Sequence, residues 1–156
     1  MDTFFEPGSD HGMSTPETRI DTGSMQLRPH ATVLLVEDHR EVRTVLARAL
    51  RKARMTVIEV ETATAAREAL IAGQVDAVIT DIALPGSVNG AELGRWIRFR
   101  FAAMPLLFIT GLTHGEVIDQ IVHDPFTRVL CKPFSIALLV QQLQVLLTGP
   151  PQPSRS

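Results

Sequence analysis

Five short apolar runs alternate with segments of helical periodicity, and this alternation constrains the fold more than any other feature of the sequence. The runs are rich in Val, Ile, Leu and Thr and end at turn residues, which is typical of buried strands. They lie at residues 32–36, 56–60, 76–80, 105–109 and 127–131. Apolar residues recur at helical spacing in residues 40–51, 62–73, 91–101, 116–122 and 135–147.

This order predicts a doubly wound α/β sandwich of five parallel strands. Runs 32–36, 76–80 and 105–109 are almost continuously apolar, so both of their faces are expected to be covered, as in parallel sheets. Polar residues interrupt run 56–60, which suits a strand at the edge of the sheet. Because the crossovers between parallel strands are right-handed, the carboxyl ends of all five strands lie at one edge.

Both ends of the chain lack this pattern. Residues 1–30 and 148–156 are expected to be disordered tails around one domain at 31–147, because Gly, Pro and Ser interrupt them and few apolar residues are available to bury. Phe4 and Phe5 are the exceptions. They could dock on the domain or on a partner, although a mobile terminus is the default expectation.

Composition excludes several classes of protein. A net charge of −2 predicts no nucleic-acid binding, which would need a basic face, and no apolar run approaches the roughly 20 residues of a membrane span. The first residues do not resemble a signal peptide. Cys131 is the single cysteine, so no internal disulfide can form, which fits a reducing cytoplasm. We expect Cys131 to be packed, and His39, His114 and His123 to be surface residues, since the histidines lack metal-ligand spacing.

Polar side chains follow four of the strands. Glu37 and Asp38 come after the first, Asp81 after the third, Thr110 after the fourth and Lys132 after the fifth. Three close carboxylates repel one another and raise one another's pKa, and a hard dication such as Mg²⁺ relieves this. Lysine supplies a positive charge that neutralises a phosphoryl group. The edge is therefore equipped to form an acyl phosphate on a carboxylate.

These motifs, taken in order, resemble the receiver domain of two-component response regulators, flavodoxin-like relatives of the bacterial chemotaxis regulator. The resemblance covers roughly residues 31–147 and implies a parallel sheet with strand order 2-1-3-4-5. The motifs are Val36-Glu37-Asp38, Asp81-Ile82-Ala83-Leu84-Pro85-Gly86 with Asn89-Gly90 and Glu92-Leu93, Ile109-Thr110-Gly111, and Lys132-Pro133-Phe134.

The resemblance implies a metal and a phosphoacceptor. Asp81 is expected to accept a phosphoryl group from a phosphohistidine. Mg²⁺ is expected to be held by Glu37, Asp38 and Asp81 with the backbone carbonyl of Ala83.

It also implies a switch and its partners. Thr110 is expected to hydrogen-bond one phosphoryl oxygen and Lys132 to pair with another, with a cis bond between Lys132 and Pro133. The phosphoryl donor is expected to be a sensor histidine kinase or a histidine phosphotransfer protein. A downstream effector protein is expected to bind the switched face.

The sequence departs from the family pattern at three positions. One extra residue lies in the loop between Pro85 and Gly90, and Gly111 stands where Ala is common. Val129 occupies the position where many members carry a Tyr or Phe that swings inward with Thr110. An aromatic rotamer switch therefore cannot operate at this position.

Three functions follow as alternatives. The leading one is a stand-alone cytoplasmic receiver, not an enzyme, acting as a monomer or a phosphorylation-dependent dimer, because the chain ends soon after its last helix. A degenerate receiver that binds proteins without phosphorylation is the second. The third, a haloacid-dehalogenase-like phosphatase, needs an Asp two residues after the nucleophile, where Ala83 stands.

Overall fold

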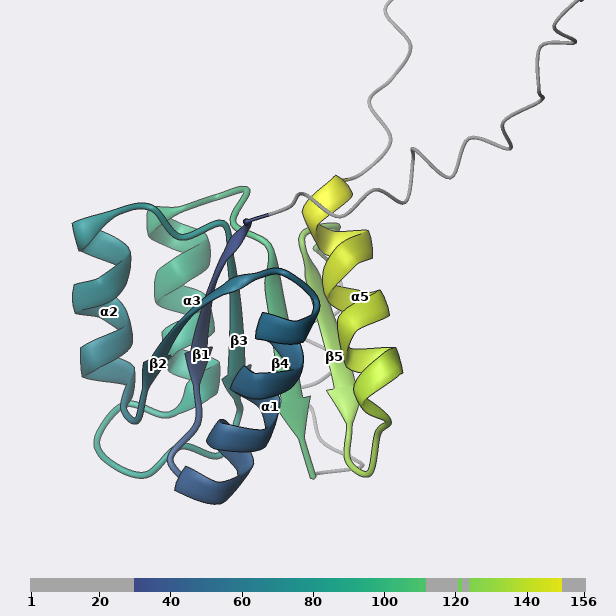
Figure 1. The fold of residues 1–156 in the computed structure, drawn as a ribbon. Coiled ribbons are helices and arrows are strands. Elements are labelled where there is room, and N and C mark those ends of the chain that lie inside the picture. The colour runs from purple at the N-terminus through teal and green to yellow at the C-terminus, as the bar shows by residue number, and fades with distance from the viewer. Residues whose placement is uncertain (1–29, 112–120, 122–123, 150–156) are drawn as a thin grey trace, which may run out of the picture.

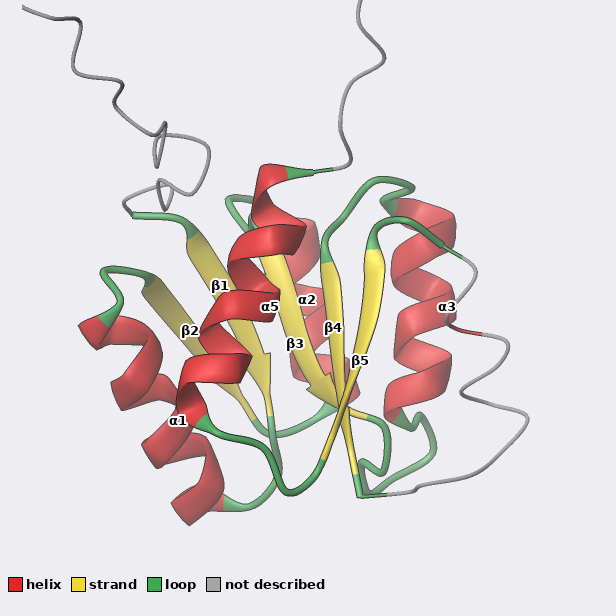
Figure 2. Cartoon of the chain, turned by 90° about the vertical axis from the view of Figure 1, so that its right-hand side faces the viewer, coloured by secondary structure: helices red, strands yellow, loops and turns green. Residues whose placement is uncertain are grey.

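The structure, a computed structural model, describes residues 30–111, 121 and 124–149. The described part of the chain is a three-layered sandwich in which one parallel sheet lies between two layers of helices (Figure 1 and Figure 2). The sheet order is β2-β1-β3-β4-β5, which confirms the predicted fold class. The strands are β1 (Thr32–Val36), β2 (Thr56–Val60), β3 (Ala77–Asp81), β4 (Leu106–Thr110) and β5 (Thr127–Cys131).

Among the described residues, four helices with defined bounds cover the sheet. They are α1 (Arg40–Lys52), α2 (Ala63–Ala72), α3 (Gly90–Arg100) and α5 (Ile136–Thr148). Of the helix predicted at 116–122, only Ile121 is among the described residues. Within the described part of the chain, no helix is long and apolar enough to cross a membrane.

Side-chain caps fix where three of these helices begin. Thr62, Asn89 and Ser135 each accept a hydrogen bond from the backbone N–H three residues later. Such caps satisfy amide groups that have no partner inside the helix. Gly73 ends α2 with φ of +89°, a conformation that favours glycine.

Successive side chains of a strand point to opposite faces of the sheet, so the core has two parts, one on each face. In β1, Val33 and Leu35 face α1 and α5, whereas Leu34 and Val36 face α2 and α3. All four side chains are buried, as expected when helices cover both faces of a parallel sheet. The two helix layers therefore hold the sheet, and its carboxyl edge, in one fixed arrangement.

Two strands are displaced by one residue from their predicted bounds. β3 ends at Asp81 and β4 at Thr110, because parallel pairing continues through Asp81↔Ile109 and Thr110↔Cys131. Asp81 and Thr110 are therefore the last residues of their strands rather than the first residues beyond them. Backbone pairing holds them more firmly than a loop position would.

The prediction that Cys131 is packed was wrong, since its side chain is exposed. β5 is an edge strand, so its last residue has a neighbouring strand on one side only. Val42, Val45 and Leu138 take part in the apolar periodicity of their helices but are 37%, 59% and 37% exposed. The buried stripe of α1 instead runs through Leu46, Ala47 and Leu50.

Candidate functional site

The sheet register places the candidate residues at one edge, the lower edge in Figures 1 and 2. Val36 is paired with Thr80 and Thr110 with Cys131, so the residues that follow these strands lie at the same level. The sequence-predicted convergence therefore follows from the pairing of the strands.

Asp81 lies at the centre of this edge and is 7% exposed. Its Oδ2 is 3.0 Å from Nζ of Lys132, and its Oδ1 accepts a 2.9 Å hydrogen bond from the backbone N–H of Ala83. The Lys132 backbone N–H donates to the carbonyl of Thr110 at 2.8 Å, and the Lys132–Pro133 bond is cis, as expected. The ammonium thus reaches across β4 to a carboxylate on β3.

An acidic pair follows β1. Glu37 is 1% exposed, and the side chain of Asp38 is 25% exposed. One oxygen from each carboxylate and Nδ1 of His39 lie within 4.8 Å of one another. Asp38 Oδ1 is buried and has no well-formed hydrogen bond among the described residues, although His39 Nδ1 is 3.2 Å away. A buried carboxylate oxygen without a hydrogen bond is costly unless a cation reaches it.

His39 is a surface residue, as expected, and it also belongs to this acidic cluster. Its side chain is 68% exposed, and its Nδ1 is 3.1 Å from Glu37 Oε1. The hydrogen bond to Glu37, together with the charges of Asp38 and Glu37, raises the pKa of His39 above its usual value. Its position directly after the Glu-Asp pair was the sequence signal for this contact. His114 and His123 lie outside the described residues.

The donor set fits a hard divalent cation. Mg²⁺ prefers oxygen ligands, and Glu37 and Asp38 offer carboxylate oxygens at the edge that Asp81 shares. The buried Asp38 oxygen, which accepts no hydrogen bond from the described residues, is the observation that favours a cation here. The imidazole of His39 is a less suitable ligand for such an ion, and its protonated form is a second way to neutralise the acids.

Thr110 is 1% exposed and completes the edge between Asp81 and Lys132. A Cβ added to the neighbouring Gly111 would have no atom of the described residues within 4 Å. Val129 is partly buried against the core cluster that contains Phe108, its partner in the β4–β5 register. The position of the usual aromatic switch is therefore filled by a small packed side chain.

Gly90 supports the site in a way that its sequence motif did not reveal. A Cβ at this position would lie 1.8 Å from the carbonyl oxygen of Asp81. The Gly90 N–H donates to the carbonyl of Ile82 at 2.9 Å. The amino end of α3 can therefore approach the backbone of Asp81 only because residue 90 has no side chain.

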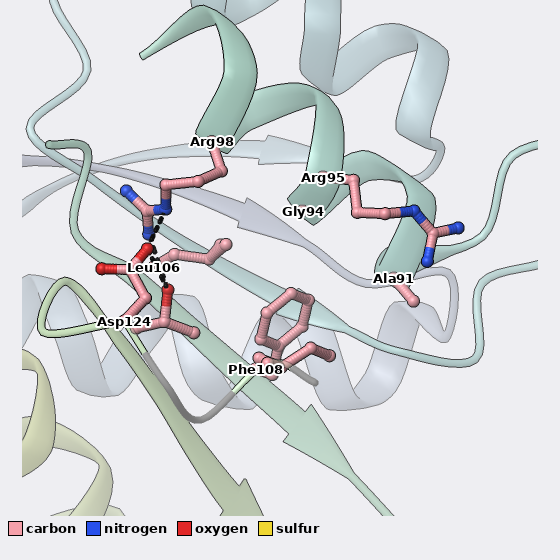
Figure 3. Close-up of a pocket in the computed structure, with 9 residues that line it drawn as sticks. Ala91, Gly94, Arg95, Arg98, Leu106, Phe108 and Asp124 are labelled. Atoms are coloured by element: carbon pink, nitrogen blue, oxygen red, sulfur yellow. Dashed lines mark hydrogen bonds and ion pairs between the residues drawn. The ribbon is translucent and has the colours of Figure 1, made fainter. Parts of the chain in front are cut away.

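A separate cavity of about 260 Å³ lies beside α3 and β4 (Figure 3). Of its two arginines, Arg95 and Arg98, the second forms an ion pair with Asp124 and donates to Thr127 Oγ1 at 2.6 Å. Its floor includes Phe108, whose ring leaves no room for a Cβ at Gly94. We assign a structural role to these ion-paired and packed groups, because their polar atoms already have partners within the protein.

Comparison with known proteins agrees with the fold. The sequence matches the response regulator receiver domain over residues 33–144. It is 30% identical over 115 residues to the response regulator receiver protein CpdR of Brucella abortus, covering 74% of this chain and 95% of CpdR. It is 29% identical over 140 residues to the sensor kinase CckA of the same organism, covering 88% of this chain but 15% of the kinase.

Solved structures give the same result. A response regulator receiver protein from Sinorhizobium medicae has a TM-score of 0.68 at 28% identity, covering 76% of this chain and 94% of that one. TrrA from Thermotoga maritima, solved in complex with Mg²⁺-BeF, has a TM-score of 0.67 at 22% identity, covering 74% and 98%. The second match supports the fold alone.

The chain belongs to the response regulator receiver family. Members of this family are signalling modules of two-component systems rather than enzymes, which argues against the phosphatase alternative. Several curated relatives are much longer than this chain, which spans 15% of CckA and 24% of the transcriptional regulator DctD of Rhizobium meliloti. CpdR has nearly the same extent as the matched region.

Proposed function

We propose that this protein is a stand-alone receiver, with residues 31–147 as its domain, that accepts a phosphoryl group on Asp81. The observation that carries the proposal is the 3.0 Å contact between Asp81 Oδ2 and Lys132 Nζ at the carboxyl edge of the sheet. A nearly buried carboxylate with an ammonium on one side and an acidic pair nearby suits phosphoryl transfer, which depends on positioning and charge neutralisation. The extent of CpdR supports the stand-alone form.

The proposed transfer is a displacement at phosphorus. A carboxylate oxygen of Asp81 forms the new P–O bond while the P–N bond to the donor histidine breaks. The electron pair of the broken bond stays on the imidazole nitrogen. Lys132 and the Thr110 hydroxyl then neutralise and hydrogen-bond the phosphoryl oxygens.

Magnesium fits the same edge. Glu37, Asp38 and Asp81 would hold the ion, together with the backbone carbonyl of Ala83. When bound, it would neutralise charge on the phosphoryl oxygens during transfer. The buried oxygen of Asp38, which accepts no hydrogen bond from the described residues, supports this assignment.

The proposed donor is a sensor histidine kinase or a histidine phosphotransfer protein, which places the reaction in the cytoplasm, where ATP supplies the phosphoryl group. The proposed effector binds the face of β5 and α5. The sequence of α5, IALLVQQLQVLLT, contains no charged residue, and its Leu138 and Val145 are 37% and 39% exposed. Apolar side chains exposed on an uncharged helix suit a protein partner. The protein acts as a monomer or as a dimer formed on phosphorylation.

Because Val129 is not aromatic, the signal needs another route. Phosphorylation draws Thr110 and Lys132 toward Asp81, and we propose that this displaces the backbone between β4 and β5 through the Lys132 N–H to Thr110 carbonyl bond. A local change of charge then biases a two-state equilibrium of this region.

Acetyl phosphate with Mg²⁺ tests the proposal. Intact-mass measurement should show one phosphoryl group on the wild type and none on Asp81→Asn. Asp76→Asn is the matched control, because Asp76 is exposed and contacts only the backbone of Thr32 in the described structure. A label that persists in Asp81→Asn would refute the phosphoacceptor assignment.

The degenerate receiver is the second candidate, and Val129 at the switch position is the observation that favours it. It predicts that the wild type is not labelled under the same conditions and still binds its partner. A partner that binds only after labelling contradicts it.

A further inference from the structure

The helices α2 and α3 carry an exposed aromatic and basic surface on the face of the sheet opposite α1 and α5. Phe99 is 92% exposed, the highest value among the exposed large apolar side chains of the described residues, and Ile71 is 62% exposed. We call this region the α2–α3 surface. It consists of Arg67, Ile71, Arg95, Trp96, Phe99 and Arg100.

Its aromatic and basic groups are placed together by the two helices. The guanidinium of Arg67 lies 5.2 Å from the centre of the Trp96 ring, across the gap between α2 and α3. Ile71 follows Arg67 by four residues and Phe99 follows Trp96 by three, so each lies one turn further along its own helix. The helices run in the same direction, and both apolar groups therefore lie toward the same end of the layer.

This surface is positively charged. Helices α2 and α3 together contain four arginines and two glutamates. Arg95 and Arg100 are exposed beside Phe99, whereas Arg98 is held by Asp124. Arg67 Nε is buried and has no hydrogen-bond partner among the described residues. A ligand that combines aromatic rings with carboxylates would complement these groups.

The chain itself contains such a ligand. Residues 2–6 read Asp-Thr-Phe-Phe-Glu, two adjacent phenylalanines between two carboxylates. The described chain begins at His30, just before β1, at the same end of the molecule as the carboxyl ends of α2 and α3, the upper end in Figure 1. An extended residue spans about 3.3 Å, so residues 7–29 can reach any point of this layer.

We propose that Phe4 and Phe5 dock on the α2–α3 surface of their own chain, with Asp2 and Glu6 facing its arginines. Tethering keeps the segment at a high effective concentration near the surface, which favours binding within one chain. The other exposed apolar groups, on α1 and α5, lie on the opposite face of the sheet. This inference does not depend on phosphorylation of Asp81.

Trp96 is the single tryptophan of the chain and reports on this surface directly. The test compares its emission maximum and its quenching by acrylamide in the full-length wild type and in Phe4→Ser/Phe5→Ser. Docked phenylalanines shield the indole, so the variant should show a red-shifted maximum and stronger quenching. A synthetic peptide of residues 1–8, added to the variant, should reverse both changes.

Two further variants complete the design. Phe99→Ser should produce the same change as the tail variant, and combining the two should add little, because both remove one contact. Leu138→Ser on α5 is the matched control and should leave Trp96 emission unchanged. Unaltered emission and quenching in Phe4→Ser/Phe5→Ser would overturn the proposal. A difference that disappears on dilution would also overturn it, since the occupant would then be a second copy.

Discussion

The contact between Asp81 and Lys132 spans β4, a strand that contains neither residue. Asp81 ends β3 and Lys132 follows β5, with β4 between the two. The Asp81 carboxylate is nearly buried, whereas the lysine side chain is 35% exposed. An ammonium that is partly in water keeps its charge at low cost and still lowers the electrostatic penalty of the buried carboxylate.

Lys132→Ala should therefore destabilise the protein without Mg²⁺. We expect a loss of about 1.5 kcal/mol in the free energy of unfolding, the lower end of the range for a hydrogen bond to a charged group, because the lysine is partly exposed. Urea denaturation in EDTA measures this loss. In an Asp81→Asn background the same substitution should cost much less. Lys52→Ala, at an exposed position on α1, is the control. Equal losses at both lysines would contradict a specific contact.

His39 should titrate above its usual pKa of about 6.5, because it faces Glu37 and Asp38. Since protonation favours the folded state, this contribution to stability is complete below the unfolded pKa and is lost as the pH rises through the folded pKa. NMR titration of the His39 ring measures the shift. Glu37→Gln should lower the pKa, because it removes the largest cause. An unchanged pKa in that variant would show that the contact is absent in solution.

At the scale of single elements, short local signals position the site. The Asn89 cap starts α3, and Gly90 lets its first turn approach the backbone of Asp81. The Ser135 cap starts α5 three residues after Lys132. Both helices therefore begin where their caps require, beside the two residues whose contact defines the edge.

Gly90→Ala should be strongly destabilising. The new Cβ would overlap the Asp81 carbonyl oxygen, and a backbone atom cannot rotate away, so we expect a loss of about 3 kcal/mol. Gly111→Ala is the matched control. Its Cβ meets open space, and the change should stay within about 0.5 kcal/mol. Thermal unfolding of both variants measures the difference. Similar unfolding midpoints would contradict the close approach of Gly90 to the Asp81 backbone.

Ser135→Ala should cost about 1 kcal/mol through loss of the hydrogen bond that Ser135 accepts from the Leu138 N–H. Ser135→Asp keeps an acceptor at the helix start and should retain most of the stability. Chemical denaturation of the wild type and of both variants measures these differences in the free energy of unfolding. A Ser135→Asp variant as unstable as Ser135→Ala would mean that the cap does not contribute.

At the scale of the whole molecule, folding would create the proposed cation site, which the unfolded chain lacks. Glu37, Asp38 and Asp81 come from two strand ends, and they share one edge only when β1 and β3 are paired. An ion that binds only the folded state stabilises it by mass action. The same reasoning links the stability of the domain to its proposed signalling chemistry.

Mg²⁺ should therefore raise the unfolding midpoint of the wild type. At a hundredfold excess over the dissociation constant the gain is about 2.7 kcal/mol. Asp38→Asn should lose most of this gain, and EDTA should reverse it in the wild type. Glu68→Gln, at an exposed position on α2, should retain it. A midpoint that does not respond to Mg²⁺ would contradict the cation site.

The sequence alone determined the alternation of strands and helices, the parallel sheet and the identity of the residues at its edge. These depend on periodicity and on turn residues, which are local properties of the chain. The sequence did not predict that Cys131, Val42 and Val45 are exposed. The rotation of a helix about its axis and the exposure of an edge strand depend on neighbours that are distant in sequence.

Tertiary structure alone decided the contacts of the site. The contact of Lys132 with Asp81 joins residues far apart in the chain, and the place of His39 among the acids depends on how Glu37 is buried. The limit that Gly90 places on α3 likewise appears only when the helix meets the end of β3. Periodicity fixes which face a side chain takes, but distances of a few ångströms depend on how separate elements pack.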